Sequence, residues 1–246
     1  MTTKDNTILI TGGATGIGLA LAEQFLNAGN TVLICGRRAD KLQEAKNKFP
    51  KLHTKVCDVS KESERVELID WAVKNFPSFN MLVNNAGIQQ AFNLHSTVSS
   101  EKVTEEVTIN LIAPIHLTSL AAPHLAKQKE AAIVNISSGL GFIPIAMMPV
   151  YCATKAALHS FSISSRHQLK NTSVKIFEII PPIVETELDH GRRSPDVRGI
   201  SPEETAAQTL KAIEENKFEF AIGKAADLYA AAHSDKSIFA FNGMNR

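Results

Sequence analysis

The residues best placed to do chemistry are a tyrosine and a lysine, Tyr151 and Lys155, in the stretch VYCATKAALHSFSISSRHQLK. On a helix, side chains four residues apart lie on the same face. An ammonium group beside a phenol favours the phenolate and lowers the phenol's pKa from about 10, which would ease proton donation near neutral pH. Taken alone, this spacing is more typical of an amphipathic helix rim with no chemical role.

The N-terminal segment predicts a phosphate-binding turn. Residues 7–11 (TILIT) have the pattern of a buried strand, and residues 19–29 (LALAEQFLNAG) continue with helical spacing. Thr11-Gly-Gly-Ala-Thr-Gly-Ile-Gly18 lies at the junction. Small residues let the backbone approach a pyrophosphate, and a helix N-terminus offers unpaired N–H groups. The alternative is a purely structural turn, but the flanking strand and helix favour dinucleotide binding.

The end of the second predicted strand, residues 31–35, bears on the choice of dinucleotide. An NAD-preferring site usually has an acidic residue there for the ribose hydroxyls. Here Gly36 takes that place, and Arg37 could pair bidentately with a 2′-phosphate. Both arginines could instead be solvated residues that open the next helix, an interpretation that suits Arg38. The sequence therefore favours NADP(H) over NAD(H).

Two further strand ends carry polar residues. The predicted strand 53–59 has Asp58 near its end, which could accept an adenine amino group or cap the helix that starts near Lys61. The next strand runs into Asn84-Asn85-Ala86-Gly87, a combination that suits a strand end close to a ligand.

The remaining candidates precede Tyr151. Residues 100–128 predict a long helix, which Pro114 would kink and thereby disturb locally at Asn110; the alternative for Asn110 is a polar core residue. A strand over residues 132–138 ends at Ser138, thirteen residues before Tyr151. The apolar loop between them is expected to form either a pocket wall or a dimer contact.

Composition restricts the class of protein. The 246 residues suit one domain without a linker, and a formal net charge of +1 gives no general attraction to nucleic acid or an anionic membrane. Three scattered cysteines are typical of reduced thiols and a cytoplasmic location. The first apolar run ends in glycines rather than continuing as a signal-peptide core, and no stretch approaches the roughly 20 apolar residues of a membrane span.

In order and spacing, TGGATGIG, Asp58-Val59, NNAG, Asn110, Ser138 and the Tyr151–Lys155 pair resemble the short-chain dehydrogenase/reductase family over about residues 7–186. The resemblance implies a single Rossmann-like, doubly wound α/β domain over residues 1–246, with a mainly parallel seven-stranded sheet in the order 3-2-1-4-5-6-7. The alternation of strands and helices independently predicts this class. The cofactor-binding part would span about 1–135 and the catalytic and substrate part about 136–246, including a lid at about 183–200.

The same resemblance implies roles for individual residues. Tyr151 would be the general acid in carbonyl reduction, Ser138 would bind the substrate oxygen, Lys155 would hold the nicotinamide ribose, and Asn110 would support a water relay. The implied cofactor contacts are Thr11, Gly12, Gly16, Ile17, Gly18, Arg37, Arg38, Asp58, Val59, Asn85, Ala86, Gly87, Tyr151, Lys155, Ile183 and Thr186. Pro182 departs from the family, which usually has glycine there, and proline fixes φ and removes an N–H group.

These observations predict an NADPH-dependent oxidoreductase acting on a ketone or aldehyde, or in reverse on a secondary alcohol. The alternatives are an NAD-dependent alcohol dehydrogenase of the same family and a non-catalytic NADP(H)-sensing protein; a Rossmann methyltransferase would have no use for the Tyr151–Lys155 pair. A homodimer through the long helices is expected, with a tetramer through the tail as the alternative. The tail, AADLYAAAHSDKSIFAFNGMNR, weakly resembles the DltE-like oxidoreductases associated with lipoteichoic acid D-alanylation.

Overall fold

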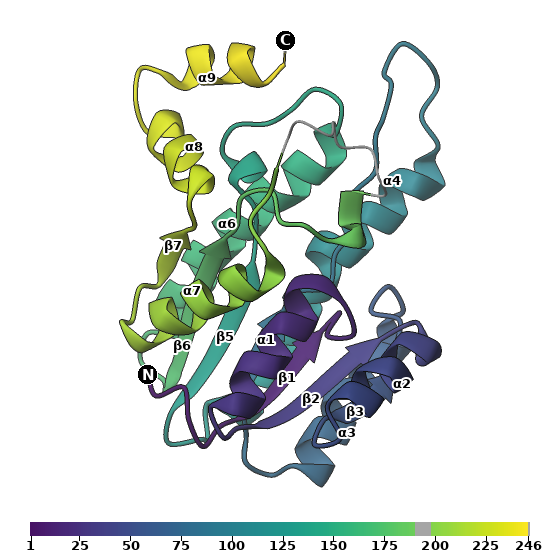
Figure 1. Ribbon diagram of the computed structural model, residues 1–246, viewed down its shortest axis with the longest axis vertical. Helices are drawn as coiled ribbons and strands as arrows, with labels where there is room; N and C mark the ends of the chain where they lie inside the picture. The colour runs from purple at the N-terminus through teal and green to yellow at the C-terminus, as the bar shows by residue number, and fades with distance from the viewer. Residues whose placement is uncertain (190–197, 246) are drawn as a thin grey trace.

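A parallel sheet of seven strands organises the computed structural model, which describes residues 1–189 and 198–245 (Figure 1). The strands lie in the order β3-β2-β1-β4-β5-β6-β7, and each adjacent pair is parallel. Their bounds are β1 Thr7–Thr11, β2 Thr31–Gly36, β3 His53–Val56, β4 Phe79–Asn84, β5 Ala131–Ile136, β6 Val174–Ile180 and β7 Glu219–Ala221. This confirms the predicted Rossmann-like α/β architecture and strand order.

Helices cover both faces of the sheet. The α-helices within the described residues are α1 Gly16–Asn27, α2 Ala39–Lys48, α3 Glu62–Asn75, α4 Ser100–Val107, α5 Ala113–Leu125, α6 Pro149–Gln168, α7 Pro202–Glu214, α8 Lys224–Ala232 and α9 Ser237–Met244. In Figure 1, α1 and α7 lie side by side against one face. The apolar residues of α1, α2 and α7 share one core cluster, and those of α3 and α5 share the cluster on the opposite face.

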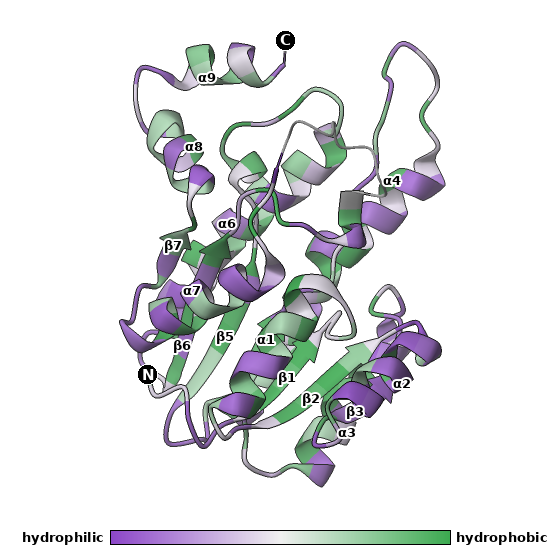
Figure 2. Cartoon of the chain, in the orientation of Figure 1, coloured by the Kyte–Doolittle hydropathy of each residue, from purple (hydrophilic) through white to green (hydrophobic). Residues whose placement is uncertain are grey.

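The central strands are apolar along their whole length because both of their faces are covered. In β1, Ile8 and Ile10 enter the core on the α1 side, whereas Leu9 enters the core on the α3 side. Figure 2 shows the hydrophobic colouring of β1 and β2 against the hydrophilic residues of α2. Burial on both faces fixes the register, since a slip by one residue would exchange the two faces.

Two predicted elements differ from the structure by more than two residues at an end or by being divided. The third strand ends at Val56 rather than Val59, because the chain leaves the sheet in a turn in which the N–H of Lys61 donates to the carbonyl of Asp58. The single helix predicted for 100–128 is instead α4, a π-helix at Thr108–Ile112, and α5. The π-helix contains Asn110, so the predicted local disturbance at this residue is confirmed. Its position before Pro114 agrees with the loss of a backbone donor at proline.

Candidate active site

The candidate site lies at one edge of the sheet. Parallel strands place their carboxyl ends together, so the segments that follow β1, β4 and β5 meet there. The turn that opens α1, residues 84–87, and Ser138 belong to these three segments. Helix α6 begins at Pro149, where proline is compatible with the first turn, and brings Tyr151 and Lys155 to the end of β5.

Tyr151 and Lys155 are both buried, with 6% and 5% of their surfaces exposed. The ammonium of Lys155 donates to the carbonyl oxygen of Ile136, the last residue of β5, at 2.8 Å. The same nitrogen lies 5.7 Å from the centroid of the Tyr151 ring. The predicted common face of these two side chains is therefore confirmed, and it points at the end of the strand that leads to Ser138.

The predicted lowering of the Tyr151 pKa is wrong. Burial raises the pKa of this phenol to about 12, and a hydrogen bond with Ser138 opposes the increase by a smaller amount. Burial dominates because removing a phenolate from water is costly, a cost that residue spacing does not reveal. The phenol consequently keeps its proton at neutral pH, as a proton donor must.

The pKa of Lys155 moves downward. Burial lowers it to about 8, although the negative charges of Glu178 and Glu106 favour the ammonium. Most Lys155 side chains are therefore still protonated at pH 7, and they lose the proton within the mildly alkaline range. A buried cation that titrates in this range is typical of a functional site.

Ser138 occupies the turn between β5 and α6. It is the N-cap of a short 3₁₀ helix, Gly139–Gly141, and its hydroxyl oxygen accepts from the N–H of Leu140 at 3.2 Å. The loop that follows packs Leu140 and Ile145 against a small cluster of Met148, Tyr151 and Cys152. This part of the loop thus packs as a small apolar cluster beside Tyr151, and its role as a pocket wall or a dimer contact stays a prediction.

Asn110 connects the π-helix to the end of β4. Its Oδ1 accepts from the N–H of Ile88 at 2.9 Å, while its Nδ2 donates to the carbonyl oxygen of Ile88 at 2.9 Å and to the hydroxyl of Thr154 at 3.2 Å. A β-carbon on Gly87 would lie 3.3 Å from Asn110 Oδ1 and 3.9 Å from Lys155 Nζ. Gly87 therefore lies directly beside two of the predicted catalytic residues.

The glycine-rich turn is held against β4 by polar contacts. The hydroxyl of Thr11 accepts from the N–H groups of Asn85 and Ala86, each at 3.0 Å. In return, Asn85 Nδ2 donates to the carbonyl oxygens of Thr11 at 2.9 Å and Gly12 at 3.2 Å. A β-carbon on Gly18 would lie only 2.3 Å from the Gly12 oxygen, so this packing requires glycine.

The turn has the features of a phosphate cradle. Gly12 and Gly16 have φ values of +62° and +54°, which other residues rarely adopt. Thr15, the N-cap of α1, makes no side-chain bond to the first turn of the helix, which contains Ile17. The N–H groups of that turn receive no bond from the N-cap side chain, and the helix dipole favours an anion there.

Both arginines predicted to contact the cofactor follow β2 directly, with their side chains about half exposed. Arg37 forms an ion pair with Glu105, with 3.6 Å between Nη1 and Oε1. Arg38 pairs with Glu187 at 3.3 Å and also donates to the hydroxyl of Thr15 at 3.4 Å. Arg38 is the N-cap of α2 as well, which agrees with the interpretation of this residue as a helix opener.

Asp58 does not cap the next helix. The N-cap of α3 is Lys61, and Asp58 Oδ1 instead accepts from the N–H of Ser60 at 3.0 Å. Burial raises the pKa of Asp58, but hydrogen bonds from Ser60 and the charge of Arg37 bring it below its usual value. Its neighbour Val59 is buried. The helix-cap alternative for Asp58 is therefore wrong, whereas its predicted contact with adenine stays a prediction.

The segment after β6 lies partly against the glycine turn. A β-carbon on Gly16 would be 3.0 Å from the methyl group of Thr186, whereas Ile183 is 46% exposed. The carbonyl oxygen of Pro181 accepts from the N–H of Gly139 at 3.1 Å, so Pro182 is accommodated without loss of this link to β5. The lid was predicted for residues 183–200, of which 190–197 lie outside the described residues. Among the described residues of this segment, Val184 forms an isolated parallel β-bridge with Ile200.

Sequence reasoning missed two contributors to the site. The hydroxyl of Thr154 accepts a hydrogen bond from Asn110, which lies 44 residues earlier in the chain. The only signal in the sequence was the position of Thr154 on the predicted helix, three residues after Tyr151. Glu178 acts on the charge of Lys155 from β6, and a glutamate within an apolar strand was the available signal.

Comparison with known proteins gives the family. The family model described as short chain dehydrogenase matches residues 6–196. The chain belongs to the short-chain dehydrogenase family. An uncharacterized oxidoreductase of Bacillus subtilis (strain 168), DltE, is 48% identical to this short-chain dehydrogenase over 239 residues, or 96% of this chain and 95% of DltE. The predicted resemblance to the DltE-like subgroup is therefore confirmed.

Another relative is similar in sequence, and two solved structures are similar in fold. An uncharacterized oxidoreductase of Staphylococcus aureus (strain MRSA252) is 30% identical over 218 residues, which cover 87% of this chain and 93% of the relative. A short-chain dehydrogenase of Burkholderia cenocepacia J2315, solved with NADP, superposes with a TM-score of 0.86 at 21% identity over the full length of both chains. One from Burkholderia phymatum, solved with NAD, gives 0.85 at 22% identity, covering 95% of this chain and 94% of that one. These two structures support the fold.

In the part of the chain that the structure describes, no helix combines the length and the apolar character needed to cross a membrane.

Proposed function

We propose that this short-chain dehydrogenase catalyses NADPH-dependent reduction of a ketone or aldehyde, and the reverse oxidation of a secondary alcohol. The observation that carries the proposal is the arrangement at the end of β5, where the buried phenol of Tyr151 lies beside Ser138 and the Lys155 ammonium. Two hydroxyl donors and one cation suit a reaction in which negative charge develops on a carbonyl oxygen.

Each predicted catalytic residue has its own role in the proposed reaction. When bound, the nicotinamide cofactor supplies the hydride. Ser138 and Tyr151 donate to the substrate oxygen, and the phenolic proton of Tyr151 passes to that oxygen as its negative charge grows. Lys155 stabilises the phenolate that remains and holds the ribose hydroxyls. Asn110 positions the groups around Lys155 through its bonds to Ile88 and Thr154. In the oxidation of an alcohol, the same phenolate acts as the base.

The cofactor would be held along the edge of the sheet. The cradle at Gly12, Gly16 and Gly18 would take the pyrophosphate, since the glycines allow the tight turn and the Thr15 side chain does not cap the first turn of α1. Asn85, Ala86 and Gly87 would lie along the nicotinamide ribose. Further contacts, carried over from the family's motifs, are Thr11, Ile17, Asp58, Val59, Ile183 and Thr186.

The proposed preference for NADPH rests on Arg37 and Arg38. Their ion pairs with Glu105 and Glu187 are exposed, and exposed pairs of this kind contribute only about 0–1 kcal/mol, so a phosphate could replace either carboxylate at little cost. A guanidinium group can pair with a phosphate through two parallel hydrogen bonds.

The proposal is tested by measuring consumption of NADPH and NADH side by side over ketones, aldehydes, quinones and 3-oxoacyl thioesters. We expect faster turnover with NADPH and a preference that reverses in Arg37→Asp. The control Lys51→Asp makes the same charge change at an exposed lysine just beyond the C-terminal end of α2 and should keep the preference. Equal or faster turnover with NADH would favour the NAD-dependent alternative. Tight NADPH binding without reduction of any carbonyl would favour a sensing protein.

We further propose one domain, divided at about residue 135 into cofactor-binding and catalytic parts, a cytoplasmic location and a homodimer. Cys35, Cys57 and Cys152 are buried free thiols, which suits a reducing compartment. Exposed isoleucines on the long helices, including Ile115 on α5 and Ile163 on α6, suit an interface between two copies.

A further inference from the structure

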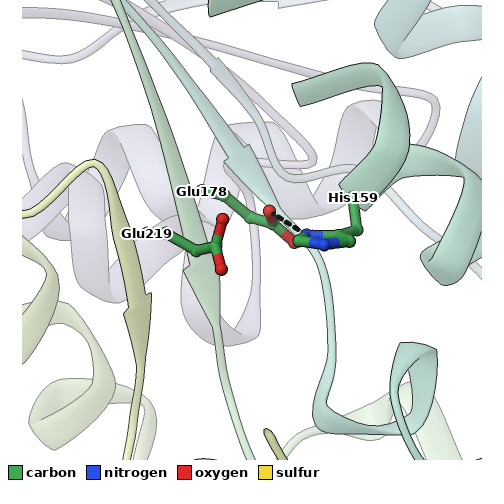
Figure 3. Close-up of side chains that lie close together, drawn as sticks. All are labelled: His159, Glu178 and Glu219. Carbon is green, nitrogen blue, oxygen red and sulfur yellow. Dashed lines mark hydrogen bonds and ion pairs between the residues drawn. The ribbon is translucent and has the colours of Figure 1, made fainter. Parts of the chain in front are cut away.

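Three side chains from neighbouring elements converge away from the proposed reaction. His159 projects from α6, Glu178 from β6 and Glu219 from β7 (Figure 3). One imidazole nitrogen and one oxygen from each carboxyl group lie within 4.8 Å of one another. Figure 3 shows the carboxyl group of Glu178 between the imidazole and the carboxyl group of Glu219.

Glu178 and Glu219 lie next to each other on two adjacent strands of the sheet. They are register partners in adjacent parallel strands, and like charges in such positions repel. Glu178 is completely buried, and its Oε2 is 2.7 Å from His159 Nδ1. Its other oxygen, Oε1, is also buried and has no hydrogen-bond partner among the described residues. A buried carboxylate oxygen without a partner is costly, so this position calls for a further donor or a cation.

The polar groups nearby stabilise mainly the negative charge of the Glu219 carboxylate. The hydroxyl of Tyr229 donates to Glu219 Oε1, and Arg166 Nη1 lies 3.9 Å from Glu219 Oε2. The guanidinium of Arg166 is held in place by the carbonyl oxygens of Ile176 and Phe218. Oε1 of Glu178 receives none of these hydrogen bonds.

We propose that His159, Glu178 and Glu219 bind one divalent transition-metal cation, such as Mn²⁺ or Zn²⁺. One imidazole and two carboxylates form a ligand set of intermediate hardness that these ions accept. Ligands at about 2.0–2.2 Å from an ion lie roughly 3.3 Å apart in a tetrahedral site. The most distant ligand atoms, within 4.8 Å of one another, must therefore close by about 1.5 Å at most, whereas His159 Nδ1 and Glu178 Oε2, now 2.7 Å apart, must separate slightly. Glu219 can supply this movement, because 22% of its side chain is exposed.

The cation would connect three elements beneath the loop that follows Ser138. The ring of Phe142 in that loop packs against His159 at 4.6 Å between centroids and against Tyr229 at 4.9 Å. Binding would fix α6, β6 and β7 relative to one another and stabilise the folded chain by mass action. Partial exposure of His159 and Glu219 leaves the remaining coordination positions to water.

The test uses the untagged full chain after dialysis against a chelator, without nicotinamide cofactor, so that its result does not depend on the proposed reaction. Mn²⁺ is titrated first and followed by electron paramagnetic resonance, because thiols compete poorly for this ion; Zn²⁺ is titrated second by calorimetry. We expect one ion per chain and a rise in melting temperature. Glu219→Gln should weaken binding by more than about tenfold, since loss of an outer-shell partner alone costs roughly 10- to 100-fold.

Glu215→Gln, an exposed glutamate close by in the sequence, is the matched control and should bind as the wild type does. Circular dichroism establishes that each variant is folded; if Glu219→Gln does not fold, His159→Gln replaces it. The proposal is wrong if the wild-type chain takes up neither ion. It is equally wrong if both ions bind a folded ligand variant as tightly as the wild type.

Discussion

A methyl group at Gly18 would test the packing of the cofactor turn. In Gly18→Ala, the new β-carbon would lie 2.3 Å from the Gly12 carbonyl oxygen and 2.6 Å from Asn85 Nδ2. Reaching even a 3.0 Å contact requires the first pair of atoms to separate by about 0.7 Å. The oxygen belongs to the backbone and Asn85 is tied to Thr11, so no side-chain rotation relieves the contact.

These contacts determine how far Gly18→Ala should lower the free energy of unfolding and the affinity for NADPH. Overpacking a buried site costs about 1–3 kcal/mol, and losing the two hydrogen bonds from Asn85 adds about 0.5–1.5 kcal/mol each, so the free energy of unfolding should fall by roughly 2–6 kcal/mol. A displaced turn that loses one hydrogen bond to a charged phosphate loses about 1.5–3 kcal/mol of binding, or roughly 10- to 100-fold in NADPH affinity. Urea denaturation and NADPH fluorescence titration measure the two effects.

Gly243→Ala is the matched control, because a β-carbon there meets no atom within 4 Å. It should change the free energy of unfolding by no more than about 1 kcal/mol and leave NADPH affinity unchanged. Wild-type stability together with wild-type NADPH affinity in Gly18→Ala would refute the reasoning about this turn.

Three other predictions follow from the site. Because burial lowers the pKa of Lys155 to about 8, kcat/KM for carbonyl reduction should fall as the pH rises through about 8, and a pH–rate profile that stays flat to pH 10 would contradict this. Asn110→Ala leaves the partly buried N–H and carbonyl groups of Ile88 unpaired and should lower the free energy of unfolding by roughly 2–5 kcal/mol in urea, against about 0.5–1.5 kcal/mol for Thr154→Val; equal losses would count against the Asn110 network. Ile163→Glu on α6 should give monomers by light scattering, whereas Ile238→Glu on α9 should not; the opposite pattern would favour assembly through the tail.

The sheet could be predicted because each central strand is a short apolar run followed by glycine or polar residues. That pattern identified the strands, located the turn before α1, and placed the end of β5 at Ser138, two residues beyond its observed end at Ile136. The pair Tyr151 and Lys155 could be placed on one face because helical spacing alone determines it. The third strand was overextended since Cys57 and Val59 are apolar and buried although the chain has already left the sheet.

Other properties depend on neighbours that are distant in the chain. The pKa of Tyr151 was predicted in the wrong direction because burial, which the spacing of two residues does not report, outweighs a favourable hydrogen bond. The grouping of His159, Glu178 and Glu219 depends on the pairing of β6 with β7 and could not be found from sequence separation. The catalytic roles of Asn110 and Ser138 stay predictions.

The central claim is that the Tyr151 phenol donates the proton to a reduced carbonyl. The most direct measurement compares NADPH oxidation and NADPH binding in wild type and Tyr151→Phe, which keeps the ring and removes only the hydroxyl, using a carbonyl substrate found in the screen. We expect turnover to fall by at least roughly 10²–10⁴-fold, the usual contribution of a general acid, while NADPH affinity changes little. Turnover by Tyr151→Phe at the wild-type rate would contradict the claim.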